Sequence, residues 1–306
     1  MFELEKIEGN TFRIRNGTNI GVYIFEDKTA LLIDTGIGGK PAERMLETLK
    51  AYNINVRYII NTHGHWDHCG GNHQVKQVYK DAVTYSSKYE KVYIEIPEIF
   101  MDYFNGGRRV PELDKIIEKN VQVPDVVAET VEPGETLNIK GHKFKIFGCE
   151  GHTAGCIGVI TDDKVAFFGD SMISKNSFAK FDFVFMYDHA VQMKTLKKIR
   201  KMDIRYGIMG HSGQIFTREG IQEAADYNDS ALVRVRKLMM NILDRPKTID
   251  EITQDFFRKK KIESDHLLYL ECRGSLMAAL EYLIKCGKVN YGVENNILKY
   301  KIADKE

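Results

Sequence analysis

The feature that most constrains this chain is a cluster of three histidines and one aspartate within six consecutive positions. The cluster reads His63-Gly64-His65-Trp66-Asp67-His68. Each of these side chains carries a lone pair or a charge, and burying it in a turn costs free energy unless it binds something. Gly64 permits a tight loop in which His63 and His65 converge, while Asp67 and His68 point elsewhere. This alternation is typical of a loop that serves two adjacent metal ions, and a solvated histidine-rich turn is the alternative.

The segments before the cluster predict an α/β architecture. Short apolar runs at 11–14, 21–25, 30–34 and 56–60 predict strands. Between the last two, apolar residues recur at helical spacing from 42 to 52, after Pro41. A strand, a helix and a second strand therefore lead into the histidines. Open α/β sheets place their sites at the carboxyl ends of strands, which is where this unit delivers the cluster.

The middle of the chain continues the pattern after an interruption. Strand patterns resume at 126–131, 137–139, 142–147, 157–161, 165–168 and 206–209, with a helix near 191–201. The stretch from 78 to 123 resembles an insertion more than part of the core. Strands before and after helices predict a layered α/β domain that extends to about residue 240.

Three more candidate ligands follow predicted strands, each directly after a glycine. They are His152, Asp170 and His211. Side chains in this position can approach a common point at one edge of a sheet. Each residue by itself could equally be an ordinary turn residue. Together with the cluster they complete a ligand set suitable for two zinc-like ions.

The ordered set resembles the metallo-β-lactamase superfamily over roughly residues 10–215. The matching elements are Ile33-Asp34-Thr35-Gly36, the block from Thr62 to Gly71, and the segments around His152, Asp170 and His211. The resemblance implies an αββα sandwich. It implies that His63, His65 and His152 bind one metal ion, and that Asp67, His68 and His211 bind a second. Asp170 would bridge the two ions, and Asp34 would support the loop without binding metal.

Such a pair of cations would lower the pKa of a shared water, so that a metal-bridging hydroxide exists near neutral pH. The candidate catalytic residues are Asp67, which can orient this hydroxide, and His211. Zinc is the preferred metal, with iron or manganese as alternatives, because nitrogen and oxygen ligands do not by themselves decide the metal.

Two positions narrow the choice of the branch of the superfamily that this sequence resembles. His65 stands where the flavodiiron oxygen and nitric oxide reductases carry a glutamate, and no flavodoxin-like pattern follows it. Asp170 stands where some true lactamases have a metal-binding cysteine. The pattern is therefore more similar to the glyoxalase II and phosphodiesterase branches, and it favours hydrolysis over redox chemistry.

Two further groups lie close to the candidate ligands in the sequence. Cys69 and Cys149 are interpreted as small apolar core residues. The aromatic residues Phe181, Phe183, Phe185 and Tyr187 alternate with other residues. We expect them either to bury one face of a strand or to form a wall against the substrate.

Residues 241–306 predict a second, small unit after residues 1–240. Thr248 and Glu251 form a capping-box pattern that begins a helix, a second helix covers 267–285, and residues 289–291 and 297–302 predict a two-stranded ribbon. Helices followed by a hairpin predict a winged-helix-like α+β domain. This region is similar to the tail of β-lactamase-like hydrolases that include animal endoribonucleases.

The charge of this tail bears on its partners. The whole chain has 44 Lys or Arg and 43 Asp or Glu, and residues 244–306 hold twelve and eleven of them. A phosphate-binding module normally shows a basic face. The basic run at 258–261 is therefore interpreted as a solvated helix end. The tail is expected to pack on the first domain or form a homodimer contact, with RNA binding as the alternative.

The leading hypothesis is a dinuclear metal-dependent hydrolase that acts on a small ester, thioester or related molecule. The alternatives are a metal-dependent phosphodiesterase or endoribonuclease, and a non-catalytic binding protein that retains the fold. Residues 1–6 carry acids where a signal peptide needs a basic region, and no run approaches the ~18 apolar residues of a membrane span. We expect a soluble cytoplasmic protein without a membrane partner, whose five cysteines stay reduced.

Overall fold

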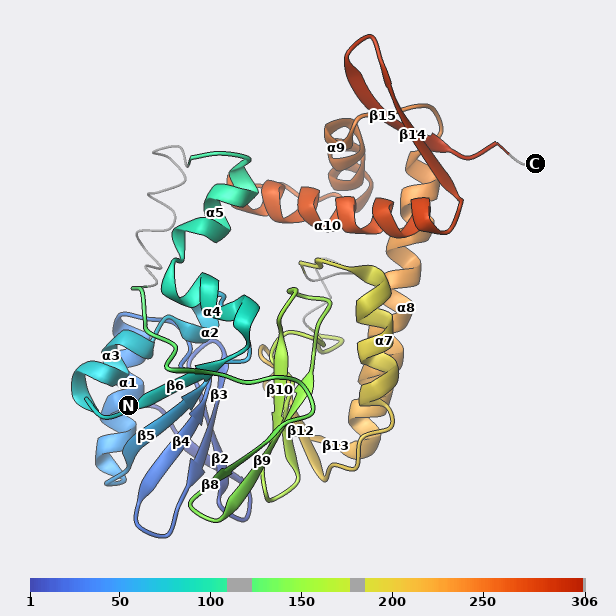
Figure 1. Ribbon diagram of the computed structural model, residues 1–306. Helices are drawn as coiled ribbons and strands as arrows, with labels where there is room; N and C mark the ends of the chain where they lie inside the picture. Colours follow the sequence, from blue (N-terminus) through green and yellow to red (C-terminus); the bar gives the residue numbers. More distant parts are fainter. Residues whose placement is uncertain (109–122, 177–184, 305–306) are drawn as a thin grey trace.

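The computed structural model describes residues 1–108, 123–176 and 185–304, and it shows two stacked β-sheets with helices on their outer faces (Figure 1). The first sheet has seven strands in chain order: β1 (Leu4–Glu8), β2 (Thr11–Arg15), β3 (Asn19–Ile24), β4 (Thr29–Ile33), β5 (Asn55–Ile60), β6 (Val83–Ser86) and β7 (Glu129–Thr130). The second has six, in the order β13 (Phe216–Thr217), β12 (Tyr206–Ile208), β11 (Val165–Phe167), β10 (Ile157–Ile160), β9 (His142–Gly148) and β8 (Thr136–Ile139). The αββα sandwich is confirmed.

The alternation of side chains along each strand explains how the layers hold together. In β4, Leu31 and Ile33 belong to the core between the sheets, where they share a cluster with Phe144 of β9. The residue between them, Leu32, belongs instead to the cluster that contains Met45 of the outer helix. Because successive side chains of a strand point to opposite faces, one strand serves both cores.

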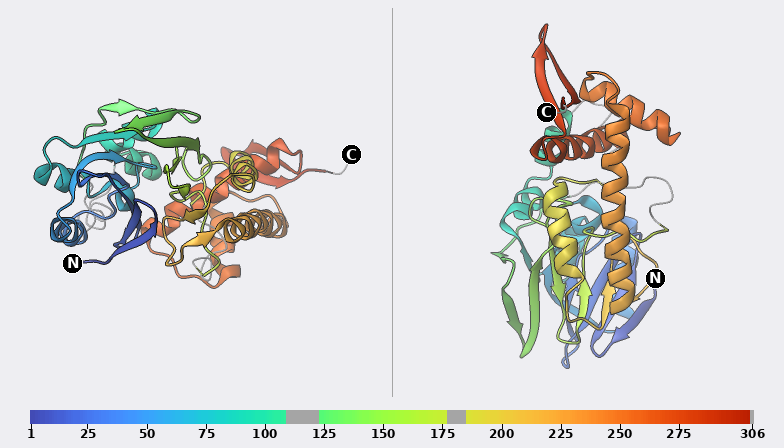
Figure 2. Two further views of the ribbon diagram at one scale, coloured as in Figure 1. Left: turned by 90° about the horizontal axis from the view of Figure 1, so that it is seen from below. Right: turned by 90° about the vertical axis from the view of Figure 1, so that its right-hand side faces the viewer.

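The outer helices cover the two sheets separately (Figure 2). Helices α1 (Lys40–Ala51) and α3 (Asn72–Val78) cover the first sheet, and α7 (His189–Ile199) and α8 (Arg218–Ile242) cover the second. Three further short helices, α2 (Trp66–Cys69), α4 (Lys88–Glu95) and α5 (Glu98–Asn105), gather at one end of the sandwich (Figure 1). Among the described residues, no helix is both long and apolar enough to cross a bilayer.

The unit that precedes the histidine cluster forms as predicted. Strands β4 and β5 pair in parallel with α1 between them, and β5 ends at Ile60, just before the cluster. The interpretation of residues 78–123 as an insertion is wrong at its start. Residues 83–86 form β6, which pairs in parallel with β5 inside the seven-stranded sheet. The run Val83-Thr84-Tyr85 has the β-branched and aromatic side chains that are typical of a strand, so the sequence did carry a signal here.

The C-terminal segment has the predicted order of helix, helix and hairpin: α9 (Ile249–Lys260), α10 (His266–Lys285), β14 (Val289–Glu294) and β15 (Ile297–Ile302). The capping box is present, because Thr248 Oγ1 accepts from the Glu251 amide at 3.2 Å and the Glu251 carboxylate accepts from the Thr248 amide at 2.8 Å. Helix α8 contributes Ile221 to the cluster under the second sheet and Met239 to the C-terminal cluster. It therefore belongs to both parts, and the division at residue 240 and the winged-helix assignment stay predictions.

The basic run at 258–261 lies at the C-terminal end of α9. Arg258 pairs there with Asp255 at 2.7 Å. Positive side chains in the last turn of a helix stabilise it by interacting with its dipole. This placement agrees with the interpretation of the run as a solvated helix end.

The capping box offers a direct test of the local structure. Thr248→Ala removes the acceptor for the Glu251 amide, and we expect it to lower the free energy of unfolding by about 1 kcal/mol. Thr248→Ser keeps the oxygen and should retain most of that stability. Urea denaturation of the full chain measures both variants. Equal stability of Thr248→Ala and the wild type would contradict the capping interaction.

Candidate metal centre

The candidate ligands lie in α2 and in the loops that follow β5, β9, β11 and β12. Helix α2 lies at one end of the sandwich (Figure 1). His65 has extended backbone angles, φ −72° and ψ 144°, and it is the N-cap of α2. Asp67 and His68 follow within that short helix. Because the backbone changes from extended to helical at His65, the side chains of His63 and His65 point in a different direction from those of Asp67 and His68. Their donor atoms accordingly fall into two main groups, and a third group of His63, His68 and Asp170 overlaps both.

The first group consists of three histidines. His65 Nδ1 lies 3.1 Å from His63 Nε2 and 3.0 Å from His152 Nε2. His63 and His152 are fully or almost fully buried. Ring nitrogens at this spacing can share a proton in pairs, but three of them leave lone pairs that face one another. A cation between them satisfies all three, so this group fits a metal ion.

The second group contains Asp67, His68 and His211. His211 Nε2 lies 3.1 Å from Asp67 Oδ2, and His68 Nε2 lies 4.0 Å from the same oxygen. Asp170 stands between the two groups: its Oδ1 lies 3.3 Å from His68 Nε2, and its Oδ2 lies 3.2 Å from His211 Nε2 and 3.9 Å from His152 Nε2. The structure therefore brings all seven predicted residues together.

Crowded donor atoms support a second cation. His68 Nε2 and Asp170 Oδ1 are buried and lie 3.3 Å apart, so they pair with each other only while His68 is protonated. A neutral His68 would leave both atoms without a partner, which costs roughly 1–3 kcal/mol. A cation held by both atoms would remove that cost. Gly210 makes room for this arrangement, because an added Cβ would lie 2.1 Å from Asp170 Oδ1.

Burial keeps the first group neutral. It lowers the pKa of His63 well below its usual range, that of His65 to about 3, and that of His152 below its usual value. These three imidazoles therefore keep their lone pairs at neutral pH.

Charge dominates in the second group. Burial opposes the protonation of His68, but the carboxylates of Asp170, Asp34 and Asp67 together raise its pKa to about 10. The negative charge of Asp170 raises the pKa of His211 to about 12. Burial opposes ionisation of Asp67, yet the two histidines lower its pKa to about 2. Without metal, this group therefore consists of protonated imidazoles between carboxylates.

Asp34 holds the cluster from beneath, as the resemblance implies. Its carboxylate accepts from the Thr62 amide and the Thr62 hydroxyl, both at 2.8 Å, and from His68 Nδ1 at 2.8 Å. The Thr62 hydroxyl in turn accepts from His63 Nδ1 at 3.1 Å. Hydrogen bonds at Nδ1 fix each ring so that Nε2 faces the group of ligands. His152 is fixed in the same way, because its Nδ1 donates to the Phe185 carbonyl at 2.7 Å.

Glu90 of α4 is a positioning residue that the sequence reasoning missed. It is fully buried. One carboxylate oxygen accepts from the Gly64 amide at 2.8 Å, and the other accepts from the Thr153 hydroxyl at 2.7 Å and the Gly155 amide at 3.0 Å. Glu90 thus ties the loop of His63 and His65 to the loop of His152.

The sequence carries a signal at Glu90, but it indicates a different role. Ser87-Lys88-Tyr89-Glu90 has the spacing of a capping box, and Ser87 Oγ does accept from the Glu90 amide at 3.4 Å. In a capping box the glutamate would return to the Ser87 amide. Here the carboxylate reaches the two ligand loops instead, and only the packing of α4 shows this.

Aromatic side chains flank the first group. The ring of Phe185 lies 6.1 Å from that of His65 and 5.8 Å from that of His152, and the ring of Phe100 lies 4.9 Å from His65. Phe181 and Phe183 lie outside the described residues. Tyr187 is largely exposed. Of the predicted aromatic wall, Phe185 therefore contacts the ligands, and Phe100 was not anticipated.

The two cysteines near the ligands are buried, as predicted. Cys69 and Cys149 have at most 1% of their surface exposed. Burial raises the pKa of both thiols, that of Cys149 to about 12. They are therefore neutral thiols at physiological pH.

Helix α10 borders the segment that contains Phe185. Burial raises the pKa of Glu271 to about 7, and the negative charge of Asp67 contributes. The Ser275 hydroxyl of the same helix accepts from the Met186 amide at 3.0 Å, next to Phe185. The C-terminal segment therefore takes part in the surroundings of the site.

Comparison with known proteins agrees with this geometry. The sequence model of the metallo-beta-lactamase superfamily matches residues 14–211. The hydroxyacylglutathione hydrolase GloC of Haemophilus influenzae is 30% identical over 164 residues, which cover 52% of this chain and 70% of that protein. A hydroxyacylglutathione hydrolase of Pelagibacter ubique is 25% identical over 240 residues, 75% of this chain and 83% of that protein. A solved metallo-beta-lactamase family protein from Thermus thermophilus has a TM-score of 0.71 at 19% identity, over 93% of both chains.

This chain belongs to the metallo-β-lactamase superfamily. It is a hydrolase of that fold, related to enzymes named hydroxyacylglutathione hydrolase. The hypothesis of a non-catalytic binding protein is thereby disfavoured.

The protonated second group predicts that metal binding releases protons. At pH 7.5 His68 and His211, with pKa values of about 10 and about 12, both carry a proton that a metal ion must displace. We expect release of about two protons, so apparent affinity should fall about 100-fold for each pH unit of acidification. Zinc titration calorimetry in two buffers of different ionisation enthalpy measures the number. His211→Ala should lower it by about one, and no release from the wild type would contradict the assignment.

The contacts of Glu90 predict a role in metal binding. Glu90→Gln replaces an accepting oxygen by an amide that can only donate, so one ligand loop loses its anchor. We expect zinc affinity to fall at least about 10-fold, measured by competition with a chromophoric chelator. Exposed Glu98→Gln on α5 is the matched control. Wild-type zinc affinity in Glu90→Gln would contradict the positioning role. So would a loss of affinity in a variant whose metal-free form is shown by circular dichroism to be unfolded.

Proposed function

We propose that this chain is a dinuclear metal-dependent hydrolase of a small ester or thioester. The observation that carries the proposal is the position of Asp170, whose two oxygens reach histidines of both groups within 3.9 Å. The hydroxyacylglutathione hydrolases among its relatives support a thioester, because a hydroxyacylglutathione joins its acyl group to the sulfur of glutathione.

The residues would divide between the two ions as the groups do. His63, His65 and His152 would hold the first ion, and Asp67, His68 and His211 the second, with Asp170 shared. When bound, two ions supply Lewis acidity that polarises a carbonyl oxygen and lowers the pKa of water. Zinc suits the imidazole-rich first group, and iron or manganese are the alternatives.

Asp67 is the group we assign to the orientation of the attacking water. Its pKa of about 2 keeps the carboxylate ionised at neutral pH. The Oδ2 atom faces His211 at 3.1 Å, which leaves Oδ1 to accept a hydrogen bond from an attacking water. An ionised carboxylate in this position orients the water by accepting a hydrogen bond from it.

The aromatic side chains would shape the substrate side of the site. Phe100 and Phe185 place apolar rings against His65, and their own ring centroids lie 6.4 Å apart. Apolar walls exclude water and accept an acyl chain. A small acyl compound suits these walls better than a polyanion does. The phosphodiesterase and RNA alternatives therefore enter the test as competing substrates.

The decisive experiment combines metal content with a substrate panel. Zinc-loaded full chain is assayed with S-lactoylglutathione, a neutral aryl thioester, bis(p-nitrophenyl) phosphate and single-stranded RNA. We expect two zinc ions per chain and turnover of a thioester, and we expect Asp67→Ala to lower kcat by about 10²–10⁴-fold. Exposed Asp81→Ala is the control.

Three outcomes would overturn the proposal. Fewer than about one metal ion per chain in active protein would remove its basis. Turnover unaffected by His65→Ala would show that the ligands are not needed. Cleavage of RNA or of the phosphodiester without thioesterase activity would replace the substrate class.

A further inference from the structure

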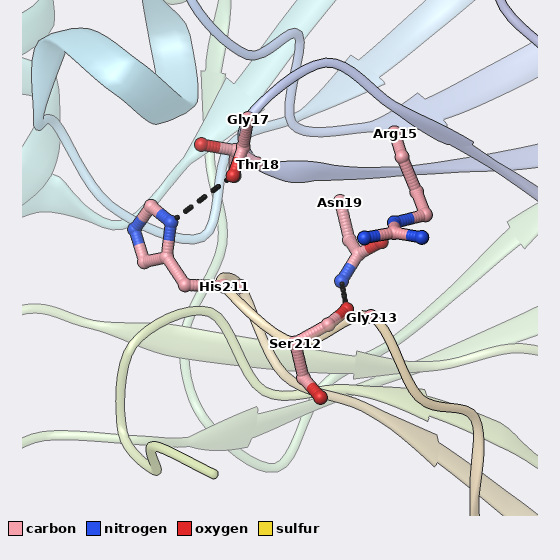
Figure 3. A pocket seen from close by; sticks show the side chains of 8 residues that line it. Arg15, Gly17, Thr18, Asn19, His211, Ser212 and Gly213 are labelled. Atoms are coloured by element: carbon pink, nitrogen blue, oxygen red, sulfur yellow. Dashed lines mark hydrogen bonds between the residues drawn. The ribbon is translucent and has the colours of Figure 1, made fainter. Parts of the chain in front are cut away.

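A surface pocket of about 320 Å³ lies beside the second ligand group (Figure 3). It lies between the turn that joins β2 to β3 and the loop that follows β12. Among its lining residues are Arg15 and Thr18 on one side and His211, Ser212 and Gly213 on the other. Its volume is at the lower end of the range for small-molecule sites, roughly 300–1,000 Å³.

The walls of this pocket are held in place by buried polar side chains. Asn19 donates from its side-chain amide to the Ser212 carbonyl at 2.6 Å (Figure 3) and to the Met209 carbonyl at 2.8 Å. Arg13, 2% exposed, donates to the Gly213 carbonyl at 2.9 Å. Fixed walls reduce the entropic cost of binding a ligand.

The two arginines of β2 differ in burial and in their ion pairs. Residues 13 and 15 lie two apart on one strand, so their side chains leave the same face. Arg13 is buried and paired with Glu5 at 2.8 Å. Arg15 is exposed and has no ion pair or hydrogen bond with any residue that the structure describes. Its guanidinium lies against Gly213, where an added Cβ would be 3.0 Å from Nη2.

The remaining polar groups of the pocket also suit an anion. None of its eight lining residues is acidic. The Thr18 hydroxyl is buried, and it has no hydrogen-bond partner within the described parts of the chain. A guanidinium fork binds carboxylate or phosphate oxygens through two parallel hydrogen bonds.

His211 connects the pocket to the metal centre. Its Nδ1 lies 3.3 Å from the Gly17 carbonyl on the pocket side (Figure 3), and its Nε2 faces Asp67 and Asp170. We propose that the pocket binds an anionic group of the substrate, a carboxylate or a phosphate, through Arg15 while the scissile bond lies at the metal centre. This inference rests on the proposed hydrolase function and narrows its substrates to esters or thioesters that carry a negative charge away from the reacting carbonyl.

The test compares matched substrates on zinc-loaded full chain. A neutral acyl thioester is paired with analogues that carry a terminal carboxylate or a terminal phosphate. Arg15→Gln should raise KM about 10- to 100-fold for the preferred charged analogue, because it removes a charge-assisted hydrogen bond. It should leave kcat and the neutral substrate unchanged. Arg15→Lys should recover part of the loss, and exposed Arg218→Gln, outside the pocket, is the control.

A binding measurement separates this inference from catalysis. Calorimetric titration with succinate and with inorganic phosphate should show binding to the wild type and weaker binding to Arg15→Gln. The anion that binds more tightly shows whether the pocket prefers a carboxylate or a phosphate. The proposed role of the pocket would be overturned if Arg15→Gln changed KM equally for neutral and charged substrates. It would also be overturned if Arg15→Gln bound the anions as tightly as the wild type. If the wild type binds anions through Arg15 but turns over no thioester, the proposed function is overturned and the pocket is not.

Discussion

The buried carboxylate of Asp170 is the constraint on which the rest of the site depends. Its two oxygens face His68, His152 and His211, which come from three different parts of the chain. A charge in that position needs compensation, because an isolated buried ion is strongly destabilising. Without metal, His68 and His211 supply it by staying protonated, as the raised pKa of each shows. With metal, the cations take over this role. The same carboxylate therefore sets both the protonation of the site and its affinity for cations.

Holding these groups together requires support from the fold rather than from the ligands. The two sheets end side by side, and each contributes loops to the site: the loop after β5 from the first, and those after β9, β11 and β12 from the second. Asp34 fixes the rings of the first loop, and Glu90 joins that loop to the one that carries His152. Asp34 adopts a φ of 61° to do this, a conformation that costs roughly 1–3 kcal/mol and persists where the surroundings impose it. The core between the sheets gives these loops a rigid base.

The two sides of the site differ in character. Phe100 and Phe185 lie against the histidines of the first group, whereas the pocket beside His211 in the second group holds Arg15. A substrate with an apolar acyl part and a remote negative charge matches both sides. The C-terminal segment adds to the surroundings through α10, whose Glu271 has a pKa raised to about 7 by burial and by the charge of Asp67. Specificity in such a site comes from these walls, since the ligands themselves set the chemistry.

The sequence by itself determined the candidate ligands of the His63–His68 loop and the layered architecture. His63 to His68 are close in the chain, their residue types are those that bind metal, and strand alternation and helical spacing are local patterns that survive folding. Strands β2 to β5, α1, both C-terminal helices and the capping box of Thr248 follow from such patterns, whereas β1 was not predicted. Tertiary structure alone decided the contacts between distant segments: the place of residues 83–86 in the sheet, the turn of Glu90 away from Ser87 toward the ligand loops, and the approach of Arg15 to Gly213. The physical reason is that these contacts join residues from about 25 to nearly 200 positions apart, and no local pattern specifies which distant partner packing will bring near.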